Sequence, residues 1–177
     1  PEDIFTKIKA GVGFGAREGD FLLGLMRRAW QKFDLTERKI MTRASAEATI
    51  ATYYAAFNAG DTPGMLACLH DDFAHHVNEG TARMGKAAFA EFCAHMSATY
   101  REELRDLVVM ANDAGTRGAA EFIVHGQYLK TDPGLPEARG QRYVLPAGGF
   151  FDLKDGKITR VTTYYNLADW VRQVSHG

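Results

Sequence analysis

Hydrophobic positions recur at helical spacing in the first hundred residues and at alternate positions after that. Apolar side chains three and four residues apart predict helices, with the ranges 20–33, 48–59, 62–70 and 86–100. Alternating apolar side chains then predict strands, with the ranges 71–77, 104–110, 118–129, 141–153 and 158–165. A closing helix follows through Trp170 and Val174. Helices followed by an antiparallel meander predict an α+β fold, with a curved sheet wrapped around helices.

Capping and turn residues support these boundaries. Ser45 is a predicted N-cap, and Pro63 stands in the first turn of its helix, where a missing amide proton costs nothing. Asp155-Gly156 predicts a tight hairpin turn before the last strand. Asn166 is the predicted cap of the closing helix.

Composition and charge narrow the class of protein. The chain has 177 residues, 46% of them hydrophobic and 24% charged, with a net charge of −1. These values indicate a globular fold and argue against a nucleic-acid or membrane partner. Cys68 and Cys93 lack the CxxC spacing of a thiolate metal site, and two cysteines make no disulfide framework. Without a signal-like start or a long apolar run, a cytoplasmic location is expected.

The chain divides near residue 44. We expect an N-terminal extension with one amphipathic helix over 1–44 and the folded domain over 45–177. The extension is interpreted as a feature outside the fold, or as an arm that docks a partner through apolar side chains, namely Leu22, Met26, Trp30 and Phe33.

Three runs carry a family resemblance. Residues 53–61, Tyr-Tyr-Ala-Ala-Phe-Asn-Ala-Gly-Asp, resemble the first helix and turn of steroid Δ5-3-ketoisomerase, in the nuclear transport factor two-like or SnoaL-like superfamily. Residues 138–148 and 164–170 are similar to ketosteroid-isomerase-related proteins of that superfamily. The resemblance implies a cystatin-like cone: a curved, mixed, mostly antiparallel sheet on three helices. It also implies a pocket for a small hydrophobic ligand, and a homodimer.

The resemblance also shows which positions of this chain correspond to the catalytic residues of a steroid isomerase. Such isomerases use a carboxylate base, a tyrosine and a protonated aspartic acid. The tyrosine position falls on Tyr53, but the base falls on Val77 and the aspartic acid on Gly148. Neither side chain can move or donate a proton, so steroid isomerisation is disfavoured unless Glu79 or His76 replaces the base.

The remaining catalytic candidates lie around the lost base. Strand alternation puts His75 and Glu79 on one face and His76 and Asn78 on the other, and the resemblance favours the His75 face as the inner one. A histidine titrates near neutral pH and therefore suits acid or base work. Tyr53, His75, His76 and Glu79 are thus the predicted catalytic residues, with solvated or structural histidines as the alternative.

Predicted ligand-binding residues are Asn78, Glu121, His125, Tyr143 and Tyr164. Glu121 and His125 share one strand face roughly 13 Å apart, which also fits the solvated side of a sheet. A metal site built from His75, Glu121 and His125 would follow no recognised spacing, so neither a metal nor another cofactor is expected. The function expected is a cofactor-independent isomerase, dehydratase or cyclase acting on a small apolar molecule. The alternative is a non-catalytic ligand-binding or dimerisation domain.

Overall fold

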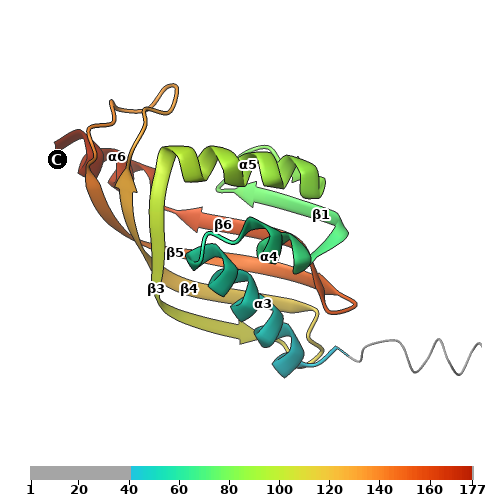
Figure 1. The fold of residues 1–177 in the computed structure, drawn as a ribbon. Helices are drawn as coiled ribbons and strands as arrows, with labels where there is room; N and C mark the ends of the chain where they lie inside the picture. Colours follow the sequence, from blue (N-terminus) through green and yellow to red (C-terminus); the bar gives the residue numbers. More distant parts are fainter. Residues whose placement is uncertain (1–40, 177) are drawn as a thin grey trace, which may run out of the picture. The chain divides into compact units, whose positions relative to one another are not determined.

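A computed structural model describes residues 41–176 of the chain (Figure 1). The predicted helix over 20–33 and almost all of the predicted extension lie outside these residues. The described helices are α3 (Arg43–Asn58), α4 (Thr62–Ala67), α5 (Gly85–Thr99) and α6 (Leu167–His176). The described strands are β1 (Leu69–Val77), β2 (Arg83–Met84), β3 (Tyr100–Ala111), β4 (Arg117–Tyr128), β5 (Arg142–Lys154) and β6 (Lys157–Tyr165).

The strands form one mixed sheet in the order β2-β1-β6-β5-β4-β3. Strands β3 to β6 make the antiparallel meander that the period-two pattern predicts, and β1 joins it by pairing in parallel with β6. The predicted α+β class, with a mostly antiparallel sheet, is confirmed. Strand β2 was not predicted, because two residues are too few to show a period.

The helix and strand ends correct several predicted boundaries. Helix α3 is capped by Thr42 instead of Ser45, in a capping box: the Ser45 amide donates to Thr42 Oγ1 at 3.1 Å and the Thr42 amide donates to Ser45 Oγ at 2.9 Å. Strand β1 begins at Leu69, inside the predicted helix over 62–70, and β3 begins at Tyr100 instead of residue 104. The Asn166 cap is confirmed, since the Asp169 amide donates to Asn166 Oδ1 at 3.0 Å.

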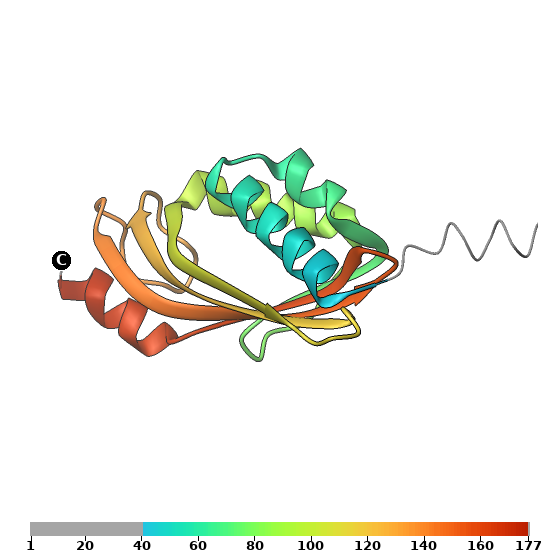
Figure 2. The same cartoon turned by 90° about the horizontal axis from the view of Figure 1, so that it is seen from below.

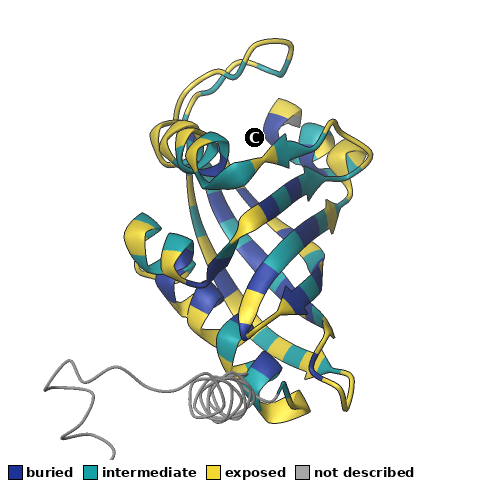
Figure 3. Ribbon diagram, turned by 90° about the vertical axis from the view of Figure 1, so that its right-hand side faces the viewer, coloured by how far each residue is buried: buried dark blue, intermediate teal, exposed yellow. Residues whose placement is uncertain are grey.

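Helices α3, α4 and α5 cover one face of the curved sheet, and α6 lies at the end of the strands where the β4–β5 loop lies (Figures 1 and 2). We call the covered face the helix-side face and the opposite one the open face. Buried and exposed residues alternate along the strands (Figure 3), as a half-covered sheet requires. The largest fully buried side chains form the core on the helix side, among them Ile50, Phe73, Phe89, Tyr128, Phe151 and Val161. None of the described helices has the length and apolar character needed to cross a bilayer.

Candidate functional site

A cavity of about 860 Å³ lies between the helix-side face and the helices. Most of its wall is apolar or aromatic, with side chains from α3, α5, the sheet and α6. This volume and lining are typical of a site for a small organic molecule. The polar side chains in the wall therefore decide what chemistry the cavity supports.

The shortest polar contact in the cavity joins Glu102 and Tyr143. The Tyr143 hydroxyl donates to Glu102 Oε1 at 2.6 Å, although Glu102 lies on β3 and Tyr143 on β5. Gly126 on β4 stands between them in the register of the three strands. Neighbouring strands are about 4.8 Å apart, so the phenol spans roughly 10 Å.

Gly126 makes this reach possible. A Cβ atom at position 126 would lie 2.0 Å from Cζ of Tyr143, inside the ring's own volume. The tyrosine ring thus lies directly across the backbone of β4, where any other residue would displace it.

Burial shapes the protonation of this pair. Burial raises the pKa of Glu102, and the hydrogen bond from Tyr143 opposes that rise without cancelling it. Burial, together with the neighbouring Glu102, also holds the pKa of Tyr143 far above its ordinary value. Tyr143 therefore stays a hydrogen-bond donor, while Glu102 exchanges its proton closer to neutral pH than an exposed glutamate does.

His75 faces the cavity, as the family resemblance implies, but its pKa lies well below neutral pH. Its ring centre lies 5.0 Å from that of Phe89 and 4.7 Å from that of Phe92. Burial, and then the charges of Arg83 and His76, lower the pKa of His75 to about 4. Within residues 41–176 its Nδ1 has no hydrogen-bond partner. At neutral pH this imidazole is a neutral hydrogen-bonding group and a poor proton acceptor.

Tyr53 also lines the cavity, on the inner side of α3. Burial, with a smaller contribution from Tyr54, raises the pKa of Tyr53, so its phenol remains a donor. The neighbouring Tyr54 hydroxyl is buried with no partner in the described part of the chain. No sequence pattern distinguishes Tyr54 from the tyrosines and phenylalanines of the core.

The two positions that the steroid isomerase resemblance leaves without acids have different surroundings. Val77 lines the cavity, whereas Gly148 follows Ala147, whose side chain faces the cavity, and so belongs to the open face. A side chain at position 148 would not enter the cavity. Two carboxyl groups that line the cavity do stand beside a tyrosine: Glu102 on β3, beside Tyr143, and Asp132 at the rim, beside Tyr100.

Several predicted site residues lie outside the cavity because strand alternation turns them to the open face. Glu121 and His125 alternate with Phe122 and Val124, which line the cavity. His76 follows the inward-facing His75 in the same way. Since His75 lies on the opposite face from Glu121 and His125, the three cannot share a metal ion. In the described residues, no three His, Cys, Asp or Glu side chains gather as a metal site.

Asn78, Glu79 and Tyr164 line a separate, more open hollow at the end of β1. Asn78 ends the strand with a φ of 47°, so Glu79 does not continue the alternation that was expected to turn it inward. The Asn78 side chain accepts a hydrogen bond from the Tyr165 amide at 3.1 Å. Tyr165, next to the predicted Tyr164, is the tyrosine of β6 that faces the cavity.

A polar cluster at the rim was not predicted. His95 Nε2 lies 3.0 Å from Asp132 Oδ2, and the Tyr100 hydroxyl donates to the same oxygen at 3.0 Å. The Asp132 amide donates to the Tyr128 hydroxyl at 2.7 Å. These contacts fasten the start of the β4–β5 loop to α5 beside the cavity.

The family model of the SnoaL-like domain matches residues 50–161, which is most of the described fold. The chain belongs to the SnoaL-like family. The predicted membership of the nuclear transport factor two-like or SnoaL-like superfamily is thus confirmed. No curated protein matches this SnoaL-like chain.

Solved structures agree with this membership. A Silicibacter protein is 64% identical, with a TM-score of 0.73, over 76% of this chain and 98% of its own. A Pseudomonas putida protein is 60% identical, with a TM-score of 0.72, over 73% of this chain and 97% of its own. Both are named as candidate polyketide cyclases. An epoxide hydrolase of the LEH-like type from M. tuberculosis, 17% identical with a TM-score of 0.56 over 76% of this chain and 92% of its own, shares the fold alone.

Proposed function

We propose that this SnoaL-like protein binds a small, largely apolar molecule in the cavity and catalyses a proton transfer on it, as an isomerase, dehydratase or cyclase does. Glu102 moves the proton. The observation that carries this proposal is the Glu102 carboxyl group, which lines an apolar cavity and accepts the Tyr143 hydrogen bond at 2.6 Å.

The proposed chemistry begins with a carbon acid next to a carbonyl group. The Glu102 carboxylate takes a proton from that carbon, and the electron pair of the C–H bond moves into an enolate whose charge rests on oxygen. Tyr53 and the neutral His75 are cavity side chains that offer N–H or O–H donors to such an oxygen. The enolate is then protonated by Glu102 at another carbon, or attacks a second carbonyl carbon and closes a ring.

The similar proteins support the ring-closing version. Two relatives more than half identical to this chain are named as candidate polyketide cyclases. A cyclase that closes rings through an enolate needs a base in a largely apolar cavity, which is the environment of Glu102.

Exchange of carbon-bound hydrogen tests the proposal without knowledge of the natural substrate. The probe is 2-tetralone in D₂O, whose α-protons are followed by NMR with and without protein. We expect accelerated exchange by the native chain and a loss of about 100- to 10,000-fold in Glu102→Gln. Glu121→Gln, which removes an exposed carboxylate on the open face, should leave the rate unchanged. Exchange at the native rate in a folded Glu102→Gln variant would exclude Glu102 as the base.

We also propose that two copies associate through the open face. Met110, Ala119 and Phe150 lie side by side across β3, β4 and β5, and Tyr164 packs against Phe150 with ring centres 5.9 Å apart. Phe150 is 50% exposed, Met110 49% and Tyr164 44%, which is an unusual apolar exposure for a sheet face. Light scattering should give twice the chain mass for the native protein and one chain mass for Phe150→Glu. A monomeric native protein would contradict this association.

A further inference from the structure

Arg83 brings a permanent positive charge to the wall of the cavity. It lies on β2, partly buried, and its guanidinium carbon stands 4.5 Å above the centre of the Phe92 ring. Arg83 lines both the cavity and the outer hollow at the end of β1, so its side chain stands where the two meet. A guanidinium group does not lose its proton in proteins, so the charge persists at any working pH.

This charge has no counter-ion in the protein. Among the described residues, no carboxylate oxygen comes within 4.0 Å of Arg83, and Glu79 in the outer hollow is exposed and does not pair with it. Arg101, which also borders the cavity, is exposed to solvent, whereas the acidic groups of the cavity have partners. Glu102 accepts from Tyr143, and His95 pairs with Asp132. The Phe92 ring attracts the Arg83 cation but does not neutralise its charge.

A second unpaired polar group stands beside Arg83. In the antiparallel register of β1 and β2, the Cα partner of Arg83 is His75. His75 is only 3% exposed, and its Nδ1 atom lacks a hydrogen-bond partner within the described residues. Buried polar groups are almost always paired. The unpaired, buried His75 nitrogen and the neighbouring Arg83, which is partly buried and has no ion pair, therefore indicate partners that a ligand supplies.

We propose that the ligand is a ring-containing carboxylic acid, whose carboxylate binds Arg83 while its apolar rings occupy the cavity. The planar fork of a guanidinium donates two parallel hydrogen bonds to a carboxylate. Arg83 then holds the acid at the outer end of the cavity, with the ring body directed inward. That this ligand is a substrate rests on the proposed function, whereas its binding to Arg83 does not.

Calorimetry with two probes of nearly equal shape tests this proposal on the full chain. The probes are 2-naphthoate, which carries the carboxylate, and 2-naphthamide, which lacks the charge. Native protein should bind 2-naphthoate about 10- to 100-fold more tightly than the amide. Arg83→Gln should bind both probes alike, and Arg83→Lys should keep part of the preference, since it keeps the charge and loses the fork.

Two arginines serve as matched controls. Arg101 borders the cavity but is exposed, and Arg142 is an exposed arginine on the open face of β5. Arg101→Gln and Arg142→Gln should both retain the preference for 2-naphthoate. Circular dichroism checks that each variant is folded, and Arg83→Lys carries the test if Arg83→Gln does not fold.

Three outcomes would overturn the proposal: equal affinity of native protein for both probes, a preference that disappears in Arg101→Gln and persists in Arg83→Gln, or no binding of either probe. Each is distinct from failure of the proposed function. If Arg83→Gln loses the preference for the carboxylate, the binding proposal is supported even when Glu102→Gln leaves hydrogen exchange unchanged. Conversely, if hydrogen exchange depends on Glu102, the proposed function is supported even when 2-naphthoate binds no more tightly than 2-naphthamide.

Discussion

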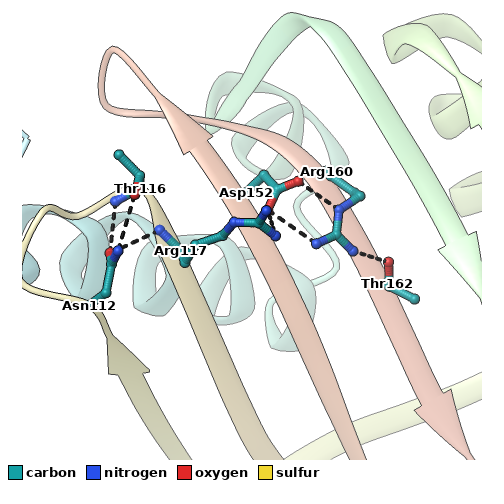
Figure 4. Close-up of polar contacts among 6 residues, drawn as sticks. All are labelled: Asn112, Thr116, Arg117, Asp152, Arg160 and Thr162. Carbon is teal, nitrogen blue, oxygen red and sulfur yellow. Dashed lines mark hydrogen bonds and ion pairs between the residues drawn. The ribbon is translucent and has the colours of Figure 1, made fainter.

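The two faces of the same sheet treat polar side chains differently. On the open face, one carboxylate and two arginines neutralise each other: Asp152 accepts from Arg160 Nε at 2.7 Å and lies 2.5 Å from a terminal nitrogen of Arg117 (Figure 4). On the helix-side face, by contrast, Arg83 lacks an ion-pair partner and His75 Nδ1 lacks a hydrogen bond within residues 41–176. A polar group that has its hydrogen-bond or ion-pair partner inside the protein can be explained by its contribution to the stability of the fold. A polar group in a cavity wall that has no such partner indicates that a ligand supplies it.

The open-face network is extended by neutral groups. Arg160 also donates to Thr162 Oγ1 at 2.6 Å, while the Arg117 and Thr116 amides donate to Asn112 Oδ1 at 3.0 and 2.9 Å (Figure 4). These contacts bind β4, β5 and β6 together near the β3–β4 turn. The comparison predicts that substitutions on this face change stability and leave ligand chemistry alone.

The largest effect on stability is expected for His75→Gln, which should remove a loss of stability that the native protein shows in acid. The unfolded histidine takes up a proton near pH 6.5, whereas folded His75 does so near pH 4. Between these values the unfolded chain binds more protons, so the free energy of unfolding falls as the pH is lowered, by on the order of 3 kcal/mol in all. Urea unfolding at pH 7 and pH 4 should show this fall in the native protein and lose it in His75→Gln.

The control for that prediction is His125→Gln, which alters a histidine on the open face. It should keep the full native fall in stability between pH 7 and pH 4. If His75→Gln shows the same fall as the native chain, His75 is not the buried neutral group that its surroundings indicate.

A smaller effect, of about 2 kcal/mol, is expected for Tyr143→Phe at pH 8. A buried carboxyl whose folded pKa is raised contributes stability at low pH that is lost as the pH rises through that folded pKa. Removing the Tyr143 hydroxyl raises the Glu102 pKa further and enlarges this loss. Urea unfolding should therefore show a larger difference from native at pH 8 than at pH 5. Tyr164→Phe on the open face should show no such pH dependence.

The smallest effect is expected for Asp152→Asn, about 1 kcal/mol at neutral pH. Its two arginine partners hold the pKa of Asp152 below the usual value, with the Arg160 hydrogen bond as the largest cause. The stabilisation is present above the unfolded pKa and is lost as the pH falls through the folded one. Asp113→Asn, at a carboxylate 90% exposed, should cost less. A loss of 2-tetralone exchange in Asp152→Asn would contradict the separation of the two faces.

The sequence predicted the fold well because its signals are local. Period-two patterning found β3 to β6, and alternation placed His75 and His76 on opposite faces, while the family resemblance indicated that the His75 face is the inner one. Glu102 was missed because the strand was predicted to begin at residue 104. Extending the alternation back from Leu104 by one step would have turned Glu102 inward as well.

Other parts of the site depend on contacts that sequence patterns do not carry. The depressed pKa of His75 follows from burial against Phe89 and Phe92, which come from a different element. Glu79 was expected inward, but the left-handed backbone of Asn78 ends the strand before it. Neither burial depth nor the end of a strand at an asparagine is fixed by the period of the pattern.

The glycine beneath the Tyr143 ring has a consequence for how this cavity can evolve or be redesigned. Positions 102, 126 and 143 occupy one row across three strands, so their identities depend on each other. An alanine at 126 is tolerated only together with a smaller side chain at 143, and a smaller side chain there no longer reaches the carboxylate at 102. We therefore expect these three positions to vary as a set in combinatorial libraries. Gly126, which has no functional group, then determines whether Tyr143 can reach Glu102.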